Sequence, residues 1–383
     1  MQAYFSELDD PRVERSRAHL LVDILSIGIL SVIAGGKGWE DMETYALSKQ
    51  EWLKQFLALP KGIPCPDTFR RVFERINPQK FEQCFRGWVQ ALVATLGAQV
   101  IPIDGKSLKG SYDREQKQSA LHVVSAWASQ HRLVLGQVKV TEKSNEITAI
   151  PALLELLDLA GCIITIDAIG TQTAIAKQIH SCKADYILAL KANHPTLHQQ
   201  VKDWFEQAQA QGFNGIEVSY DERVETGHHR LEKRQLWSVP VSQLPPLHHG
   251  TDWAGLQSVV MVIRVRHLWN KTTRQVQFYL TSLASEAVKI GRAIRQHWGI
   301  ENGLHWTLDV TFAEDACRVR SGHAPQNLSL LRRIALNALN RESSWRRSTR
   351  QKSNRAAMDN HYMLKVLAAC LPQPESATSP ICQ

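Results

Sequence analysis

Val100-Ile101-Pro102-Ile103-Asp104-Gly105-Lys106 is the run of residues from which the architecture of this chain follows most directly. Its apolar half, rich in β-branched residues, predicts a buried strand. A second apolar run, residues 162–166, ends in the same way at Asp167. Because neighbouring strands of an open sheet present their carboxyl ends to one crevice, we expect Asp104 and Asp167 to face the same site.

The sequence around these runs alternates between strand and helix patterns. Residues 121–128 and 133–140 are rich in Val and Leu and predict two strands joined by a polar turn. Residues 147–159 and 171–182 have the apolar spacing of helices, and residues 186–190 predict another buried strand. Three antiparallel strands followed by a strand–helix–strand unit predict an α/β fold, a mixed sheet flanked by helices.

Residues 1–98 predict an all-helical N-terminal domain. Asn77-Pro78 is a helix start signal, and apolar residues then recur at helical spacing until Gly97. A shorter helix before it carries Arg70, Arg71 and Arg75. The pair fits either a helix-turn-helix that binds DNA ends or a plain helical bundle, since residues 1–98 hold 12 basic and 12 acidic side chains.

Residues 196–283 interrupt the α/β rhythm. This stretch is polar, contains prolines and has strand-like pieces at 258–265 and 276–281, so it predicts a β-rich insertion. Residues 286–308 then predict one long helix, and residues 328–339 predict another.

These patterns divide the chain into five parts. The α/β core is expected in two segments, residues 99–195 and 284–340, on either side of the insertion. Residues 341–383 are expected to form a basic C-terminal tail whose last dozen residues are loose.

The charge of the chain favours a polyanionic partner. The 383 residues include 45 Lys and Arg against 37 Asp and Glu, a net charge of +8, which excludes an acidic disordered chain. Residues 284–383 alone hold 14 basic and 8 acidic side chains. Within them, residues 318–355 hold ten basic residues against one acid, Glu342, so the excess lies after the predicted long helix.

Other coarse features point to a reduced, cytoplasmic protein. Charged residues precede any apolar run, which is not the pattern of a signal peptide. The most apolar stretch, residues 20–36, contains Asp23 and predicts a buried helix rather than a membrane span. The seven cysteines are scattered, with no C-x-x-C pair, which argues against a zinc finger or a disulfide framework.

A third acidic residue, Glu301, lies in the predicted long helix with His297 and His305 four residues to either side. Carboxylates that share a crevice repel each other unless a cation neutralises them, and oxygen-rich sites favour Mg²⁺ or Mn²⁺. The residues alone leave three alternatives open. The aspartates are caps or turn formers, the histidines and Glu301 bind zinc, or the helix is simply amphipathic, with Trp298 and Trp306 in the core.

Together these motifs closely resemble bacterial insertion-sequence transposases of the DDE type, and especially the H-repeat-associated subfamily linked to Rhs elements. Phe5-Ser6-Glu7-Leu8-Asp9-Asp10-Pro11-Arg12 resembles the N-terminal region of that subfamily, so the resemblance covers nearly the whole chain. The residues that carry it are Asp104-Gly105-Lys106, Asp167-Ala168-Ile169-Gly170-Thr171-Gln172, His297-Trp298-x-Ile300-Glu301-Asn302-x-Leu304-His305-Trp306 and Leu308-Asp309-Val310-x-Phe312-x-Glu314-Asp315.

The resemblance implies an RNase H-like core with a β-rich insertion before the helix of the third carboxylate. It implies a catalytic, metal-binding triad of Asp104, Asp167 and Glu301 that holds two Mg²⁺ or Mn²⁺ ions, with Asp104 bridging both. The expected activity is that of a polynucleotidyl transferase and endonuclease, which cleaves transposon-end DNA and transfers the 3′-hydroxyl strand to target DNA. The expected partners are double-stranded DNA and a second copy in a synaptic homodimer, in the nucleoid and without a membrane.

Several residues outside the triad are expected to contact DNA. Related transposases carry a Tyr, an Arg and a Lys around the third acid; this chain departs from that pattern, with Ile294, His297 and Leu308 at those places. The candidates are Lys106, His229, Arg230, Arg234, His297, Asn302, His305, Arg318, Arg320, Arg346, Arg347 and Arg350.

Two other function classes would share some of these features. A catalytically inactive DNA-binding protein, either a decayed transposase or a repressor, would share the basic surfaces but would never nick DNA. A glycosidase with paired carboxylates would predict neither the basic C-terminal region nor a third acid on a helix.

Overall fold

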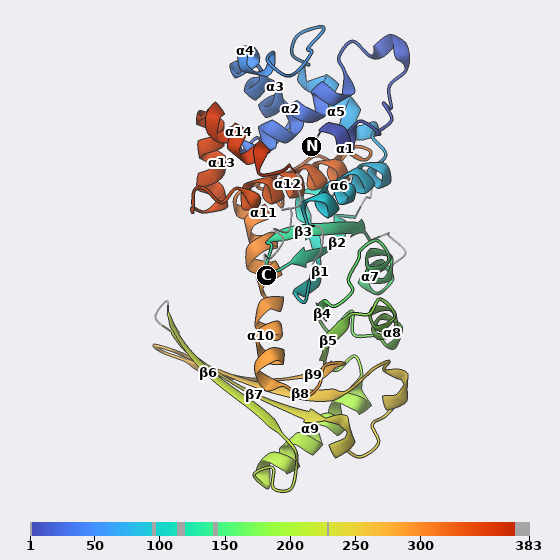
Figure 1. The fold of residues 1–383 in the computed structure, drawn as a ribbon, viewed down its shortest axis with the longest axis vertical. Helices are drawn as coiled ribbons and strands as arrows, with labels where there is room; N and C mark the ends of the chain where they lie inside the picture. Colours follow the sequence, from blue (N-terminus) through green and yellow to red (C-terminus); the bar gives the residue numbers. More distant parts are fainter. Residues whose placement is uncertain (1, 94–96, 113–118, 141–144, 228–229, 372–383) are drawn as a thin grey trace, which may run out of the picture.

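The computed structural model describes residues 2–93, 97–112, 119–140, 145–227 and 230–371. Its centre is a mixed sheet of nine strands in the order β3-β2-β1-β4-β5-β9-β8-β7-β6 (Figure 1). The strands are β1 (Val100–Leu108), β2 (Leu121–Ala128), β3 (Leu133–Lys139), β4 (Ile163–Ile166), β5 (Asp185–Leu190), β6 (Ser219–Gly227), β7 (Arg230–Pro240), β8 (Ser258–Leu268) and β9 (Thr272–Thr281).

The direction of the strands changes across the sheet. β1, β4 and β5 are parallel neighbours, whereas β1 to β3 form an antiparallel meander. β5 pairs antiparallel with β9, and β8, β7 and β6 extend the sheet beyond it. The predicted mixed sheet is therefore confirmed, and the strands expected within residues 196–283 belong to the same sheet as the core.

Helices cover both faces of the sheet. On one face, helix α10 (Ala287–His297) packs its apolar side on Val100, Ile163 and Ile187 of the three parallel strands. On the other face, α7 (Glu146–Glu155) packs on β2 and β3, and α8 (Thr173–Ser181) packs on β5. Because strand side chains alternate between faces, the three parallel strands are apolar on both sides, as expected for buried parallel strands.

The N-terminal helices and the C-terminal helices form one layer at the top of Figure 1. The N-terminal set is α1 (Gln2–Phe5), α2 (Leu21–Ile33), α3 (Trp39–Ser48), α4 (Gln50–Leu53), α5 (Pro66–Arg75) and α6 (Pro78–Leu92). The predicted helix start is confirmed, since the Asn77 side chain accepts hydrogen bonds from the backbone N–H groups of Gln79 and Lys80.

The helix before α6 gives little support to the helix-turn-helix alternative. The guanidinium of Arg70 pairs with Asp67 and Glu74 of its own helix, at 3.0 Å and 3.1 Å. Arg71 lies 3.9 Å from Asp67. The charges on α5 thus pair largely among themselves, as in the plain helical bundle.

Helix α12 (Ala324–Arg341) is buried along almost its whole length and joins the helical layer to the sheet. The Asn337 amide accepts a hydrogen bond from the N–H of Val134 and donates one to its carbonyl. These two bonds pair backbone groups of β3 that face away from the sheet, because β3 is an edge strand. The Asn327 amide donates to the carbonyls of Phe73 and Ile76 at the end of α5. Side chains of α12 therefore fix the position of both layers.

Three expectations about secondary structure need correction. The polar stretch after residue 195 begins with a long helix, α9 (Pro195–Ala210), whose buried Leu197, Val201 and Phe205 lie on one face. Strand β1 continues beyond Asp104 to Leu108 because β2 pairs with it there. The expected basic tail contains two helices, α13 (Thr349–Met358) and α14 (Asn360–Ala368), which pack against α12; the loose end expected at 372–383 lies outside the described residues.

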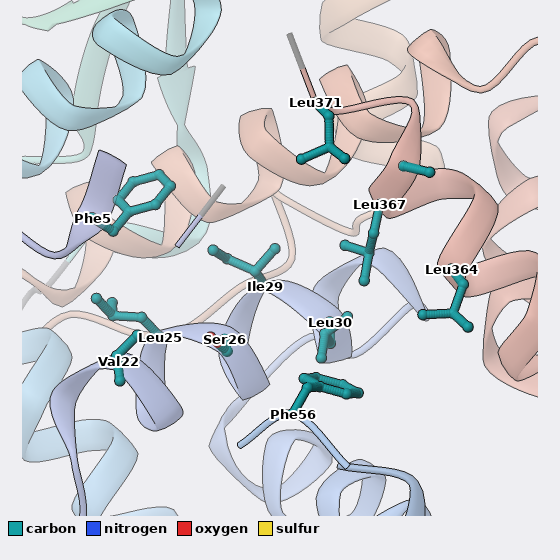
Figure 2. Close-up of a pocket in the computed structure, with 11 residues that line it drawn as sticks. Phe5, Val22, Leu25, Ser26, Ile29, Leu30, Phe56, Leu364, Leu367 and Leu371 are labelled. Atoms are coloured by element: carbon teal, nitrogen blue, oxygen red, sulfur yellow. The ribbon is translucent and has the colours of Figure 1, made fainter. Parts of the chain in front are cut away.

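The two ends of the described chain meet at an apolar hollow of about 450 Å³. Figure 2 shows Phe5 and the side chains of α2 on one side and Leu364, Leu367 and Leu371 from α14 on the other. The hollow thus belongs to the junction of the N- and C-terminal helices. Within the described ranges, none of the helices combines the length and the apolar character needed to span a bilayer.

A buried carboxyl group lies where α6 meets the sheet. Glu82 is 7% exposed, and one of its oxygens accepts a hydrogen bond from the N–H of Gln137 at 3.0 Å. The other oxygen has no hydrogen-bond partner among the described residues. Burial raises the pKa of Glu82 to about 8, in spite of the nearby Arg86 and Arg333.

The Glu82→Gln variant should remove a pH dependence of stability. The folded protein keeps a proton that the unfolded chain loses above its ordinary pKa, so the free energy of unfolding should fall as pH rises from about 5 to about 8. Gln accepts the same hydrogen bond and never ionises. In thermal melts, the stability of the variant relative to wild type should increase as the pH rises. The difference should reach on the order of a few kcal/mol at the upper end of this pH range. Parallel curves would contradict the assignment.

Candidate active site

Parallel pairing of β1 with β4 places the first two carboxylates side by side. The register runs from Val100 opposite Ile163 to Ile103 opposite Ile166, so Asp104 and Asp167 are the next residues on the two strands. By alternation, both side chains project on the face that α10 covers, about 4.8 Å apart at the backbone. The expectation that the two aspartates share one edge of the sheet is met by this register.

The third acid reaches this edge through an irregular turn. The helix predicted over 286–308 is present but irregular: α10 ends at His297, residues 299–300 are again helical, and the π-helical turn η5 (Glu301–His305) leads into α11 (Trp306–Val310). Here the N–H of Trp306 donates to the carbonyl of Glu301, five residues earlier. Such wide turns often occur at functional sites, and this one places Glu301 and His305 toward β1.

Asp104, Glu301 and His305 form a cluster of possible metal ligands. Their ligand atoms all lie within 4.8 Å of one another. The Nδ1 atom of His305 is 3.2 Å from Glu301 Oε2 and 3.6 Å from Asp104 Oδ2. Asp167 is not in this tight cluster, and one of its oxygens accepts a hydrogen bond from the N–H of Ile169.

The electrostatics of Asp104 fit a cation site. Burial raises the pKa of Asp104 to about 7, and the neighbouring acids Asp167, Glu146 and Glu301 raise it further, against the hydrogen bond from the Gly105 N–H. A carboxyl group that is buried among other carboxylates is destabilised in its charged form. A divalent cation at this point would relieve that repulsion.

The two histidines of the motif lie inside the site. His305 has a side chain only 6% exposed, and burial lowers its pKa in spite of the adjacent Glu301. His297 contacts Thr165 of β4 through Nδ1 at 2.9 Å, and burial lowers its pKa as well. These positions do not favour the DNA contacts expected for both residues; they favour neutral imidazoles that support the carboxylates.

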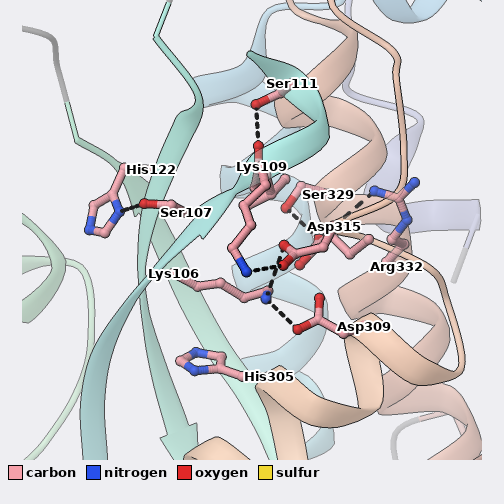
Figure 3. A network of polar contacts seen from close by, with 12 residues as sticks. Lys106, Ser107, Lys109, Ser111, His122, His305, Asp309, Asp315, Ser329 and Arg332 are labelled. Atoms are coloured by element: carbon pink, nitrogen blue, oxygen red, sulfur yellow. Dashed lines mark hydrogen bonds and ion pairs between the residues drawn. The ribbon is translucent and has the colours of Figure 1, made fainter.

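Lys106 has a different environment from the one expected of a phosphate contact. Its side chain is 9% exposed, and its Nζ lies 2.7 Å from Asp309 of α11 and 3.3 Å from Asp315 (Figure 3). Burial opposes its charge, but these carboxylates raise its pKa. Lys106 therefore ties strand β1, two residues beyond Asp104, to the segment that follows Glu301.

A second buried ion pair holds the same segment against α12. Glu314 and Arg333 are both fully buried as side chains and lie 2.9 Å apart. Arg333 also donates to Ser329 Oγ, and Ser329 in turn donates to Glu314. Burial opposes the charge of Glu314, but Arg333 and Arg332 keep its pKa below the ordinary value. Arg332 and Arg333 thus belong to the structural core, not to a DNA-binding surface.

The tryptophans beside Glu301 are not core residues. Trp298 is 42% exposed and Trp306 is 58% exposed, which corrects the alternative of an amphipathic helix that buries both. The apolar anchors of the segment are instead Ile300, Leu304 and Leu308. Exposed indole rings therefore lie on either side of Glu301 in the sequence.

The remaining expected DNA contacts lie on several surfaces. Arg230 and Arg234 are on β7, and Asn302 and Arg318 are exposed, whereas Arg320 donates to the Gly110 carbonyl. Arg346 and Arg347 are exposed between α12 and α13, and Arg350 is exposed in the first turn of α13. His229 lies outside the described residues. DNA binding by these residues stays a prediction.

Sequence patterns missed one acidic neighbour of the site. Glu146, the first residue of α7, contacts His122 Nε2 at 2.8 Å, and His122 Nδ1 lies 2.7 Å from Ser107. A Cβ at position 105 would meet the ends of the Glu146 and His122 side chains, so both lie directly against Gly105. No local signal marks Glu146, because only the packing of α7 on the meander brings it here.

The fold is mixed α/β, and acidic side chains meet where two parallel strands end beside a π-turn. This arrangement is typical of a metal-dependent enzyme. Comparison with known proteins gives the family. Residues 2–89 match the family described as DDE_Tnp_1-associated, and residues 95–338 match the Transposase DDE domain. The chain belongs to this DDE transposase family.

Individual relatives agree with this family. The chain is 37% identical to "H repeat-associated putative transposase YhhI" of Escherichia coli K12, over 96% of this chain and 97% of that protein. It is 37% identical to "Putative transposase YncI" of Escherichia coli O157:H7, over 96% and 94%. A piggyBac transposase synaptic complex with hairpin DNA aligns with a TM-score of 0.41 at 12% identity, over 96% of this chain and 81% of that one.

The Lys106→Met variant should loosen the site by leaving Asp309 and Asp315 without their shared cation. We expect a loss on the order of 2 kcal/mol in the free energy of unfolding, because one partner of a largely buried ion pair is removed. Lys109 is the matched control: its Nζ also lies 3.1 Å from Asp315, but its side chain is 81% exposed. Lys109→Met should cost less than about 1 kcal/mol in thermal or urea unfolding. Equal losses would contradict the role given to Lys106.

Proposed function

We propose that the protein is a metal-dependent DNA transposase, in which Asp104, Asp167 and Glu301 are the catalytic carboxylates. The observation that carries the proposal is the register of β1 and β4, which puts two acids of a DDE-family chain next to each other, with Glu301 brought to them by the π-turn. The substrates are double-stranded transposon ends and target DNA. A synaptic homodimer and two Mg²⁺ or Mn²⁺ ions belong to the same proposal.

The first five strands of the sheet support an RNase H-like core as part of this proposal. Their order β3-β2-β1-β4-β5 combines an antiparallel meander with a parallel strand–helix–strand unit. Strands β6 to β9 and helix α9 then correspond to the insertion expected before the third acid. The boundaries at residues 98, 195, 283 and 340 remain predictions.

The donor set fits a divalent cation. Carboxylate oxygens of Asp104 and Glu301 converge, and Asp104 has the raised pKa of an acid that lacks a positive partner. Oxygen donors favour Mg²⁺ or Mn²⁺, and the nitrogen of His305 also suits Mn²⁺ or Zn²⁺. When bound, such ions supply Lewis-acid stabilisation of charge at the transferred phosphorus and a water of lowered pKa.

The side chains of the site would each have a defined task in two in-line displacements. In the first, an oxygen of water bonds to phosphorus as the 3′ oxygen of the transposon strand leaves with a proton. In the second, the oxygen of that 3′-hydroxyl bonds to a target phosphorus and gives up its proton, and the target's own 3′ oxygen leaves with a proton. Asp104 and Asp167 are held rigidly by β1 and β4, His305 orients Glu301, and His297 is held against β4 by Thr165.

The Asp104→Asn variant should abolish Mg²⁺-dependent cleavage of transposon-end DNA, by at least about a thousandfold, because one catalytic anion is lost. Binding of the same DNA should stay within about threefold, since no arginine surface changes. Asp158→Asn, which removes an exposed carboxylate after α7, is the matched control and should cleave like wild type. Gel assays of nicking and anisotropy measure the two quantities. Full cleavage by Asp104→Asn would disprove the assignment.

Divalent metal alone should stabilise the folded protein. Millimolar Mg²⁺ or Mn²⁺ should raise the thermal midpoint of wild type, because a ligand that binds only the folded state adds to its stability. The shift should vanish in Asp104→Asn and shrink in Glu301→Gln and Asp167→Asn. A shift with Zn²⁺ only, retained in Asp167→Asn but lost in His305→Gln, would favour the zinc alternative.

An inactive DNA-binding protein remains the second candidate function. The same assays distinguish it from the enzyme. It predicts equal binding of transposon ends with and without Mg²⁺ and no nicking by wild type. The enzyme is the function that the residues support better, because Asp104 and Asp167 follow paired strand ends and Glu301 converges with Asp104.

A further inference from the structure

A second concave site lies on the same face of the sheet as the carboxylates. It is a groove of about 400 Å³ between strands β6 to β9 and helix α10. Six arginines line it, and we call it the arginine groove: Arg223, Arg230, Arg234, Arg264, Arg266 and Arg295. Trp298 and Asn302 also line it, one on each side of Glu301 in the sequence. The segment that carries the third acid therefore separates this groove from the metal site.

Positive charge exceeds negative charge in the groove. Against the six arginines stand three acids, Asp221, Glu225 and Glu232. Glu232 is 3% exposed and pairs with both Arg234 and Arg266. Glu225 is likewise shared, between Arg234 and Arg295. Shared acids cannot neutralise all of their partners, so the internal ion pairs leave a surplus of positive charge.

The strand register concentrates this surplus. Arg234 on β7 lies directly opposite Arg264 on β8. Like charges at directly opposite positions destabilise a sheet unless something neutralises them. Arg264 donates a hydrogen bond to the uncharged Gln275, and the Arg230 side chain makes no ion pair or hydrogen bond with a described residue. Burial and the adjacent Arg266 also hold the pKa of Arg264 below its ordinary value.

The spacing of the arginines suits a chain of phosphates. Arg264 and Arg266 are two residues apart on one strand, which separates them by roughly 6.6 Å, comparable with the distance between successive phosphates of an extended nucleic-acid strand. Guanidinium groups bind phosphate oxygens in pairs, and an exposed indole such as Trp298 offers a surface on which a base can stack. A cationic groove with an aromatic side chain is the usual composition of a single-strand site.

We propose that the arginine groove holds the sugar-phosphate backbone of one DNA strand and leads it past Trp298 to the carboxylates. The identity of the ligand as DNA rests on the proposed function. The proposal adds Arg264, Arg266 and Arg295, none of which the sequence patterns singled out, to the expected Arg230 and Arg234. It also gives Trp298 a role as the base-stacking surface between groove and metal site.

The test compares two double variants that each remove two positive charges from the same part of the sheet, strands β7 to β9. Arg230→Gln combined with Arg264→Gln replaces the two groove arginines that have no acidic partner among the described residues. No buried acid loses its ion pair in this variant. Lys271→Gln with Arg274→Gln is the control, because Lys271 lies in the turn and Arg274 lies opposite Val265, on the other face. Binding of a labelled single-stranded oligothymidine is followed by anisotropy in EDTA at several salt concentrations.

The groove variant should bind the oligothymidine at least about tenfold more weakly at low salt, and its salt slope should fall by roughly 1.4, or about 0.7 for each lost phosphate contact. The control should stay within about twofold with its slope unchanged. Trp298→Leu should weaken binding about tenfold with the slope of wild type, since stacking and not charge is lost. If the double variant fails to fold, Arg230→Gln alone, at an exposed position, should lower the slope by about 0.7.

Three outcomes overturn the proposal: an unchanged slope in the groove variant, equal losses in groove and control variants, or a loss confined to a blunt duplex of the same length. The measurement contains no divalent metal. The binding measurement can therefore be interpreted even if the wild-type protein never cleaves DNA. A negative result in it would not contradict the catalytic role proposed for Asp104.

Discussion

The parallel pairing of β1 with β4 is the constraint on which the candidate site depends. The apolar residues from Val100 to Ile103 and from Ile163 to Ile166 are buried on both faces, by α10 on one side and by α7 and α8 on the other. A slip of one residue would turn every one of these side chains to the opposite face, so the register is strongly fixed. The same register places Asp104 and Asp167 next to each other, and core packing thereby sets the geometry of an acidic pair that is unfavourable by itself.

The rest of the site is attached to this pair by buried ion pairs. Lys106 connects β1 to Asp309 and Asp315, and Glu314 connects the same segment to Arg333 in α12. Glu301 lies on the π-turn just before residues 309–315, which these two sets of ion pairs hold in place. This explains how the largely exposed Glu301 is kept beside the half-buried Asp104. Charges that sequence inspection would assign to phosphate binding are, in Lys106, Arg332 and Arg333, used to hold the protein together.

Helix α10 borders the arginine groove and ends near the candidate metal site. Its apolar face packs on the parallel strands, and Arg295 pairs with Glu225 of β6. The carboxylates lie beyond its C-terminal end, and the arginine groove lies along its side toward β6 to β8. A strand of DNA held in that groove would reach the metal site without crossing the covered part of the sheet.

The sequence by itself determined the mixed α/β sheet, most strands and helices, and the family, because apolar periodicity and short motifs are local properties of the chain. The roles of the three acids remain a proposal. The sequence did not determine the helix α9, whose polar residues hid a narrow apolar face, or the exposure of Trp298 and Trp306. Nor did it reveal that Lys106 is an ion-pair partner, that Glu146 lies beside Gly105, or that arginines of β7 and β8 converge. Those features join residues that are far apart in the chain, and only the pairing of strands and the packing of helices bring them within reach of one another.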